Sequence, residues 1–77
     1  MNKEDFVQNF ANQFDETDEA EITFNTVFKD LDEWSSLLSL SVIAMCDEDY
    51  DVKIKGDDIR NANTVEDLYN IILSRKQ

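Results

Sequence analysis

The sequence contains no histidine, and this absence removes most of the common catalytic and metal-binding arrangements. Neither a serine nor a cysteine nucleophile can be activated by histidine, and a zinc site of mixed Cys and His ligands cannot be built. With a single cysteine, the chain cannot form an internal disulfide. We expect Cys46, in the apolar run 43–46, to be a buried, unreactive thiol. One glycine, Gly56, is too few for a glycine-rich phosphate loop, so the composition points away from an enzyme.

Positive charge is also scarce, since seven Lys and Arg face 18 Asp and Glu, for a formal net charge of −11. Such a surface repels nucleic acid and anionic lipid, so we expect neither as a partner. No apolar run approaches the roughly 18 residues of a membrane span, and residues 1–6 do not resemble a signal peptide. We therefore expect a cytoplasmic monomer whose partners present basic patches, unless the charge serves only solubility.

The chain is long enough for one domain, 1–77, with a single thin core. Disorder is disfavoured because 42% of the residues are hydrophobic. Phe6, Phe10 and Phe14 recur at four-residue spacing, which predicts an amphipathic helix over about 3–14. Asn2 is placed to cap its start.

A second helix is predicted over about 36–50, with Ser35 or Ser36 as its N-cap. Leu37, Leu40 and Ala44 follow helical spacing and define its expected apolar face. This helix holds more apolar residues than a one-sided surface helix needs. We therefore expect two of them to stay outside the core, where a partner can reach them. These two residues are Leu38 and Met45.

The remaining segments complete an all-helical prediction. Residues 15–35 form a long loop, of a length that is often functional, with several apolar side chains able to pin it to the core. Those side chains are Ile22, Phe24, Val27, Phe28 and Leu31. Residues 57–60 can form one short helical turn after Gly56, and Thr64 can cap a last helix over about 65–75. The fold class is thus all-α: a small bundle of three main helices and one short helix, with a long loop between the first two helices.

An acidic stretch, 47–58, superficially matches a calcium-binding loop. The matching residues, at loop positions 1, 3, 5, 8 and 12, are Asp47, Asp49, Asp51, Ile54 and Asp58. Position six, however, is Val52, where an EF-hand requires glycine, and position twelve lacks the longer glutamate. Loose binding of divalent cations by crowded carboxylates is the better prediction.

The start of the second helix is the remaining place for chemistry. A serine there, after a long loop, is exposed and approachable. A phosphodiester attached to it would meet free backbone N–H groups and the positive end of the helix dipole. From the residues alone, the simpler interpretation that Ser35 and Ser36 only cap the helix stays open.

This segment resembles the attachment motif of the acyl carrier protein family, Asp-Ser-Leu. Here the motif reads Ser35-Ser36-Leu37, preceded by Trp34, and the resemblance places 4′-phosphopantetheine on Ser36. Residues 43–54 are similar to the end of the family's second helix, and residues 63–68 to the start of its last one. The resemblance covers nearly all 77 residues, most specifically 31–72.

Two departures from the family pattern bear on partner choice. Ser35 stands in place of the motif's aspartate, and Leu38 and Ser41 stand where carriers of fatty acid synthesis are commonly acidic. Asp47 and Glu48 remain as the matching acids. These departures favour a specialised carrier that serves a dedicated biosynthetic cluster.

What the resemblance implies is a carrier and not an enzyme. A phosphopantetheinyl transferase would take the arm from coenzyme A, and the arm would hold acyl intermediates as thioesters for enzymes of fatty acid or related lipid metabolism. The residues expected to be recognised by partners are Trp34, Ser35, Leu37, Leu38, Ser41, Met45, Asp47 and Glu48. An aminoacyl, peptidyl or polyketide carrier is the alternative within the family. An acidic helical interaction protein without a prosthetic group is the alternative from another class.

Overall fold

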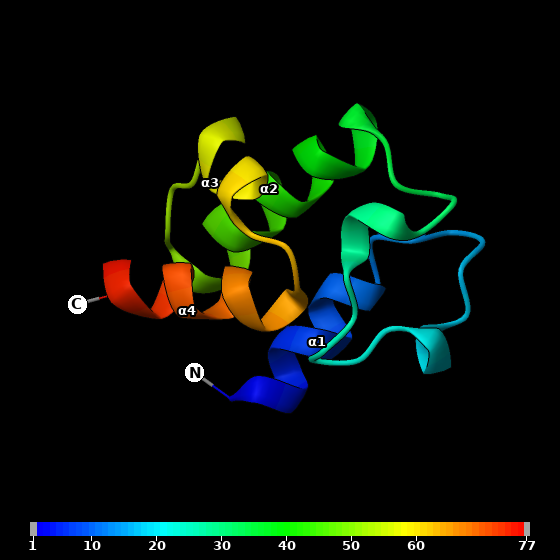
Figure 1. Ribbon diagram of the computed structural model, residues 1–77. Coiled ribbons are helices and arrows are strands. Elements are labelled where there is room, and N and C mark those ends of the chain that lie inside the picture. Colours follow the sequence, from blue (N-terminus) through cyan, green and yellow to red (C-terminus); the bar gives the residue numbers. More distant parts are fainter. Residues whose placement is uncertain (1, 77) are drawn as a thin grey trace.

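The computed structural model describes residues 2–76, which form four α-helices and two short 3-10 helices and contain no strand (Figure 1). In chain order they are α1 (Lys3–Ala11), η1 (Glu19–Glu21), η2 (Phe28–Asp30), α2 (Ser36–Tyr50), α3 (Gly56–Asn61) and α4 (Val65–Arg75). The predicted all-α bundle is confirmed, and α2 and α4 have the predicted bounds. The first helix ends three residues earlier than predicted, and the short helix is longer than one turn.

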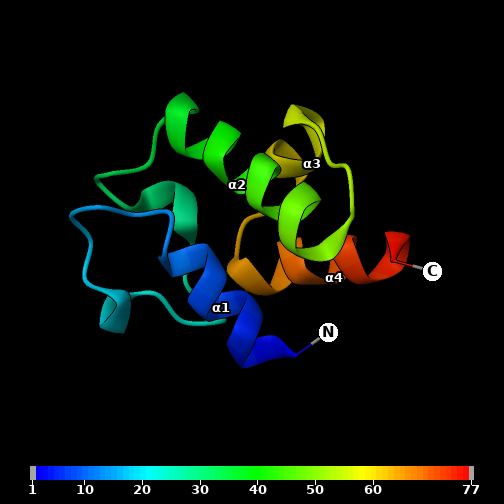
Figure 2. The ribbon, with the colours of Figure 1, turned by 180° about the vertical axis from the view of Figure 1, so that it is seen from behind.

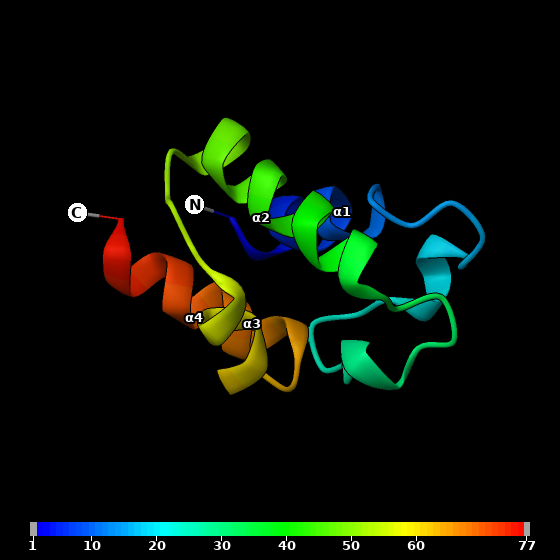
Figure 3. The same ribbon diagram turned by 90° about the horizontal axis from the view of Figure 1, so that it is seen from above.

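Helices α1 and α4 contact each other, and each of them also contacts one further helix. Helix α1 contacts both α2 and α4, and α3 lies against α4. Seen from above, α2 crosses over α1, and α3 lies beside α4 (Figure 3). The view from behind shows the long loop, 12–35, extending past the end of α1 and returning to the start of α2 (Figure 2). This loop therefore decides where α2 begins.

Aromatic side chains form the centre of the core. Phe6, Phe10 and Phe28 are fully buried, and the ring centroids of Phe10 and Phe28 are 5.4 Å apart. Because Phe28 belongs to the long loop, this contact fixes the loop onto α1, as predicted. Ile22 is also buried, but Val27 is 41% exposed and was wrongly expected in the core. The backbone of Val27 instead forms an isolated bridge with Thr64.

The buried face of α2 differs from the predicted one. Leu37 and Leu40 are 74% and 63% exposed, whereas Leu38 and Met45 are only 8% and 3% exposed. The expectation that Leu38 and Met45 lie outside the core is therefore wrong. The physical reason is that the apolar residues of α2 occur on every side of the helix, so their spacing does not select one buried face. The contact with α1 selects the buried face of α2, which is the face that contains Val42.

The acidic stretch does not have the geometry of a calcium loop. Its first four residues continue α2, and Asp51 ends the helix in a left-handed conformation with φ of 57°. Asp58 accepts hydrogen bonds from both terminal nitrogens of Arg75, at 2.6 and 2.5 Å. Within residues 2–76, no group of three or more acidic, Cys or His side chains could hold a metal ion. The predicted loose binding of divalent cations therefore finds no preformed site among these residues.

Candidate functional site

Ser36 is the first residue of α2 and is exposed to solvent. Of the two predicted caps, Ser35 is the N-cap: its backbone is extended, and its hydroxyl accepts the N–H of Leu38 at 3.3 Å. Its carbonyl accepts the first regular helical bond, from Ser39 at 3.0 Å. The hydroxyl of Ser36 meets no hydrogen-bond partner in the described part of the chain. Ser35 thus does the capping, and the Ser36 hydroxyl remains available.

The backbone at the start of α2 is equally open. Among residues 2–76, no acceptor meets the N–H groups of Ser36 and Leu37. The first turn of α2 contains no acidic residue, whereas the first turns of α1, α3 and α4 each contain two. In a chain with 18 acids, this leaves the positive end of the longest α-helix uncompensated. An anion at this place would meet two free donors, and the first turn of α2 would oppose it with no carboxylate.

Trp34 holds the loop directly before this site. Its ring lies 4.8 Å from that of Phe28 and is stacked at 10° on that of Phe10, with 6.4 Å between centroids. The indole is half-buried, so one side packs on the core and the other remains accessible. This aromatic anchor fixes the chain entering α2 without using the hydrogen-bonding groups at the helix start.

Glu33 fastens the same loop from its other side. Its carboxylate accepts the N–H groups of Asp15 and Glu16, and both the N–H and the hydroxyl of Thr17, at 2.7–3.0 Å. Desolvation raises the pKa of Glu33, but these hydrogen bonds outweigh it and hold the pKa below its ordinary value of 4.5. The two ends of the long loop are thereby tied together, which keeps the start of α2 in place.

A groove of about 510 Å³ opens beside Ser36, between α2 and α3. It is lined chiefly by Lys29, Trp34, Ser36, Leu40, Ile43, Ile59 and Arg60. Two of the seven cationic residues thus lie at one rim. The Nζ of Lys29 donates to the backbone carbonyl of Arg60 at 2.7 Å, and the guanidinium of Arg60 forms an ion pair with Asp57. Sequence reasoning missed both cations. Their separation of 31 residues conceals their proximity, and only the scarcity of cations could have drawn attention to them.

The predicted recognition residues divide into three groups. Ser35 and Leu37 are exposed beside Ser36, with Trp34 and Ser41 half-buried nearby on the same helix or just before it. Asp47 and Glu48 are exposed, but they lie 11 and 12 positions further along α2, roughly 17 Å from Ser36 along the axis. Leu38 and Met45 face the core. The structure therefore offers an apolar contact near Ser36 and an acidic one at the far end of the helix.

Cys46 is fully buried, as predicted. Burial, with a further contribution from the charge of Asp49, raises the pKa of its thiol to about 12. At neutral pH the thiolate that would act as a nucleophile is therefore almost absent. Any thioester on this protein would have to form on a thiol that the chain itself does not supply.

Searches with the chain found no matching family model, no matching curated protein and no matching solved structure. No helix in residues 2–76 combines the length and the apolar character that crossing a membrane requires.

Proposed function

We propose that this chain is an acyl carrier protein that bears 4′-phosphopantetheine on the hydroxyl of Ser36. The observation that supports it most is the open start of α2: an exposed hydroxyl, two unpaired N–H groups and no carboxylate in the first turn. A phosphodiester carries one negative charge and several acceptor oxygens. It would therefore gain from both the free donors and the helix dipole.

The chain's own contribution to loading is the presentation of Ser36. The transferase would join the Ser36 oxygen to the phosphorus of the phosphopantetheine and release adenosine 3′,5′-bisphosphate from coenzyme A. The proton of the hydroxyl would go to a base of the transferase, since the chain has no histidine and the first turn of α2 contains no carboxylate. The arm supplies a terminal thiol that holds the cargo as a thioester, a role that buried Cys46 cannot fill.

The groove beside Ser36 supports the same proposal. Lys29 is suited to the phosphodiester, whereas the guanidinium of Arg60 is already paired with Asp57. The apolar lining is suited to the uncharged remainder of the arm. Leu40 on the groove's rim and Leu37 beside it are largely exposed and would offer a small apolar contact to partner enzymes. With the acids at the far end of α2, this gives fast, weak recognition by enzymes with basic patches, as a carrier requires.

The test is the intact mass of the protein after incubation with coenzyme A, magnesium and a broad-specificity phosphopantetheinyl transferase. We expect a gain of one phosphopantetheinyl group in the wild type and in Ser35→Ala, and no gain in Ser36→Ala. Circular dichroism of both variants checks that each is folded. Modification that persists in Ser36→Ala would contradict the proposal. With no gain in the wild type, the next step is a transferase from the protein's own source.

Cargo and pathway follow from the loading enzyme and not from this chain. Ser35 in place of the motif's aspartate favours dedicated partners over those of general fatty acid synthesis. An aminoacyl, peptidyl or polyketide intermediate is therefore the second cargo class to test, by offering the modified protein to loading enzymes encoded beside its gene.

The exposed leucines of α2 also suit an interaction protein that never carries an arm. That alternative predicts that Ser36→Ala leaves the function in the cell intact, whereas Leu37→Ala and Leu40→Ala abolish it. The carrier proposal predicts that Ser36→Ala is the most damaging of the three.

A further inference from the structure

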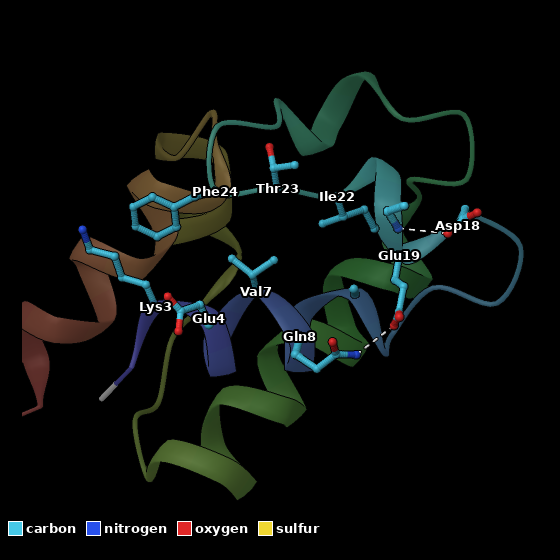
Figure 4. A pocket seen from close by; sticks show the side chains of 11 residues that line it. Lys3, Glu4, Val7, Gln8, Asp18, Glu19, Ile22, Thr23 and Phe24 are labelled. Atoms are coloured by element: carbon cyan, nitrogen blue, oxygen red, sulfur yellow. Dashed lines mark hydrogen bonds between the residues drawn. The ribbon is translucent and has the colours of Figure 1, made fainter.

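A second groove runs along the outer side of α1, far from Ser36 in the sequence, and has no lining residue in common with the groove beside Ser36. It lies between α1 and segment 18–24 of the long loop and has a volume of about 590 Å³. Pockets that bind ligands typically measure about 300–1,000 Å³. Val7 and Ile22 point toward each other across it, from the helix and from the loop (Figure 4). Ala11 and Phe24 complete an apolar floor.

Both ends of this groove are bridged. At one end Gln8 Nε2 donates to Glu19 Oε2 at 2.9 Å, and at the other the Nζ of Lys3 lies 5.3 Å from the ring centroid of Phe24 (Figure 4). These contacts join helix and loop on either side of the apolar floor. The groove therefore follows the axis of α1 over residues 3–11, a length of roughly 12 Å.

The rim of this groove is negative. Glu4, Asp18 and Glu19 contribute three carboxylates against the one ammonium of Lys3. The groove beside Ser36 has no carboxylate among its lining residues, and its rim holds Lys29 and the Asp57-paired Arg60. A fatty acid or another apolar anion would be repelled by the carboxylates of the negative rim, whereas an apolar group flanked by cations would be attracted.

We propose that the α1 groove docks a protein segment that presents apolar side chains flanked by Lys or Arg. The straight floor along one side of a helix suits such a segment, because helical peptides commonly place an apolar stripe in grooves of this kind. The long basic side chains would reach the carboxylates while their methylene stems cover the apolar floor. The inference does not depend on Ser36, so the groove can bind a partner while the arm is held by another enzyme.

The probe is a synthetic amphipathic peptide with leucine on one face and lysine on the other, added to the ¹⁵N-labelled full chain at low salt. We expect the largest amide shifts at Val7, Ala11, Ile22 and Phe24. The exposed Leu37 of α2 is the internal comparison, because a peptide drawn only by exposed leucines would shift that region instead.

Charge reversal tests the rim. We expect the double variant Glu4→Lys/Glu19→Lys to bind the peptide about tenfold more weakly. The matched control is Asp32→Lys/Asp49→Lys, which changes the net charge equally at two exposed positions outside the groove and should retain most of the affinity. Gln8→Ala removes the hydrogen bond to Glu19 without a change of charge, so it separates the loss of this bridge from the loss of charge.

Three results would overturn the inference. The first is peptide shifts confined to α2, and the second is an equal loss of affinity in both charge-reversal variants. The third is binding of decanoate in this groove that improves in Glu4→Lys/Glu19→Lys, which would make it a site for apolar anions. None of them bears on the modification of Ser36, which the mass measurement tests separately.

Discussion

The starts of α4 and α2 are built in different ways. At α4 the first two N–H groups donate to loop carbonyls: Val65 to Thr26 at 3.1 Å and Glu66 to Phe24 at 2.9 Å. The third N–H, that of Asp67, donates to the hydroxyl of the N-cap Thr64 at 3.1 Å. The Asp67 carboxylate in turn accepts the N–H of Thr64 at 3.1 Å, so the two side chains form a capping box.

Of these bonds, the start of α2 has only the one from the third N–H group to the side chain of the N-cap residue. Ser35 accepts the N–H of Leu38, the first two N–H groups are unpaired, and no carboxylate folds back. Aromatic packing by Trp34 holds the segment instead. The difference shows that this fold can pair every donor at a helix start, as it does at α4. At α2 it leaves the donors open, where we propose that a phosphodiester is attached.

The largest effect on stability is expected when this aromatic anchor is removed. Trp34→Ala should lower the free energy of unfolding by about 2–3 kcal/mol, because a half-buried indole loses its contacts with the rings of Phe10 and Phe28. Urea unfolding followed by circular dichroism measures it. Trp34→Phe keeps one aromatic ring in place, so it should lose at most half as much unfolding free energy as Trp34→Ala. A loss no greater than that of an exposed residue would mean that Trp34 does not anchor α2.

Thr64→Ala removes the side-chain cap of the closed start. We expect a loss of about 1 kcal/mol, since the N–H of Asp67 loses its acceptor and the capping box is broken. The same urea unfolding experiment measures this loss. Thr64→Ser keeps the hydroxyl and should restore most of the stability. If Thr64→Ser is as unstable as Thr64→Ala, the hydroxyl is not the cause.

Acid should weaken the capping box of the closed start, whereas the open start has no carboxylate in its cap. The N–H groups of Asn63 and Thr64 hold the pKa of Asp67 below its ordinary value of 3.8. Its contribution to stability is therefore fully present above pH 3.8 and is lost as the pH falls through the lower folded-state pKa. The stability difference between wild type and Asp67→Asn should shrink from pH 6 toward pH 2–3. A difference that stays constant with pH would contradict the role of the carboxylate.

The smallest effect is expected at the open start itself. Ser35→Ala should cost only about 0.5 kcal/mol, because its single side-chain bond, at 3.3 Å, is longer than the corresponding bond of Thr64. Ser35→Asp keeps a cap and restores the motif's aspartate, so we expect it to be at least as stable as the wild type. It should also be modified faster by a broad-specificity transferase. A Ser35→Ala loss equal to that of Thr64→Ala would remove the distinction between the two starts.

The sequence predicts a helix well where caps and one-sided periodicity agree. Thr64 and the apolar spacing after it gave the bounds of α4, and the phenylalanine stripe placed α1 on the core. Orientation failed in α2, because leucines occur on every side and only the neighbouring helix decides that Leu38 is buried and Leu37 exposed.

The candidate site was predictable only in part. Ser36 is proposed from its motif, and its predicted place at an exposed helix start is confirmed. The groove cations, Lys29 and Arg60, were not predictable, because they come from distant parts of the chain. The unpaired N–H groups were also invisible, since an absence of acceptors depends on how the loop packs and not on which residues stand nearby.

The most direct test of the carrier role is the mass of the protein isolated from its own source, with the modified residue located by fragmentation of the peptide that contains it. The account predicts one phosphopantetheinyl group, alone or with a thioester-linked cargo, on Ser36. Isolation of only the unmodified chain, from cells in which Ser36→Ala also causes no loss of function, would contradict it.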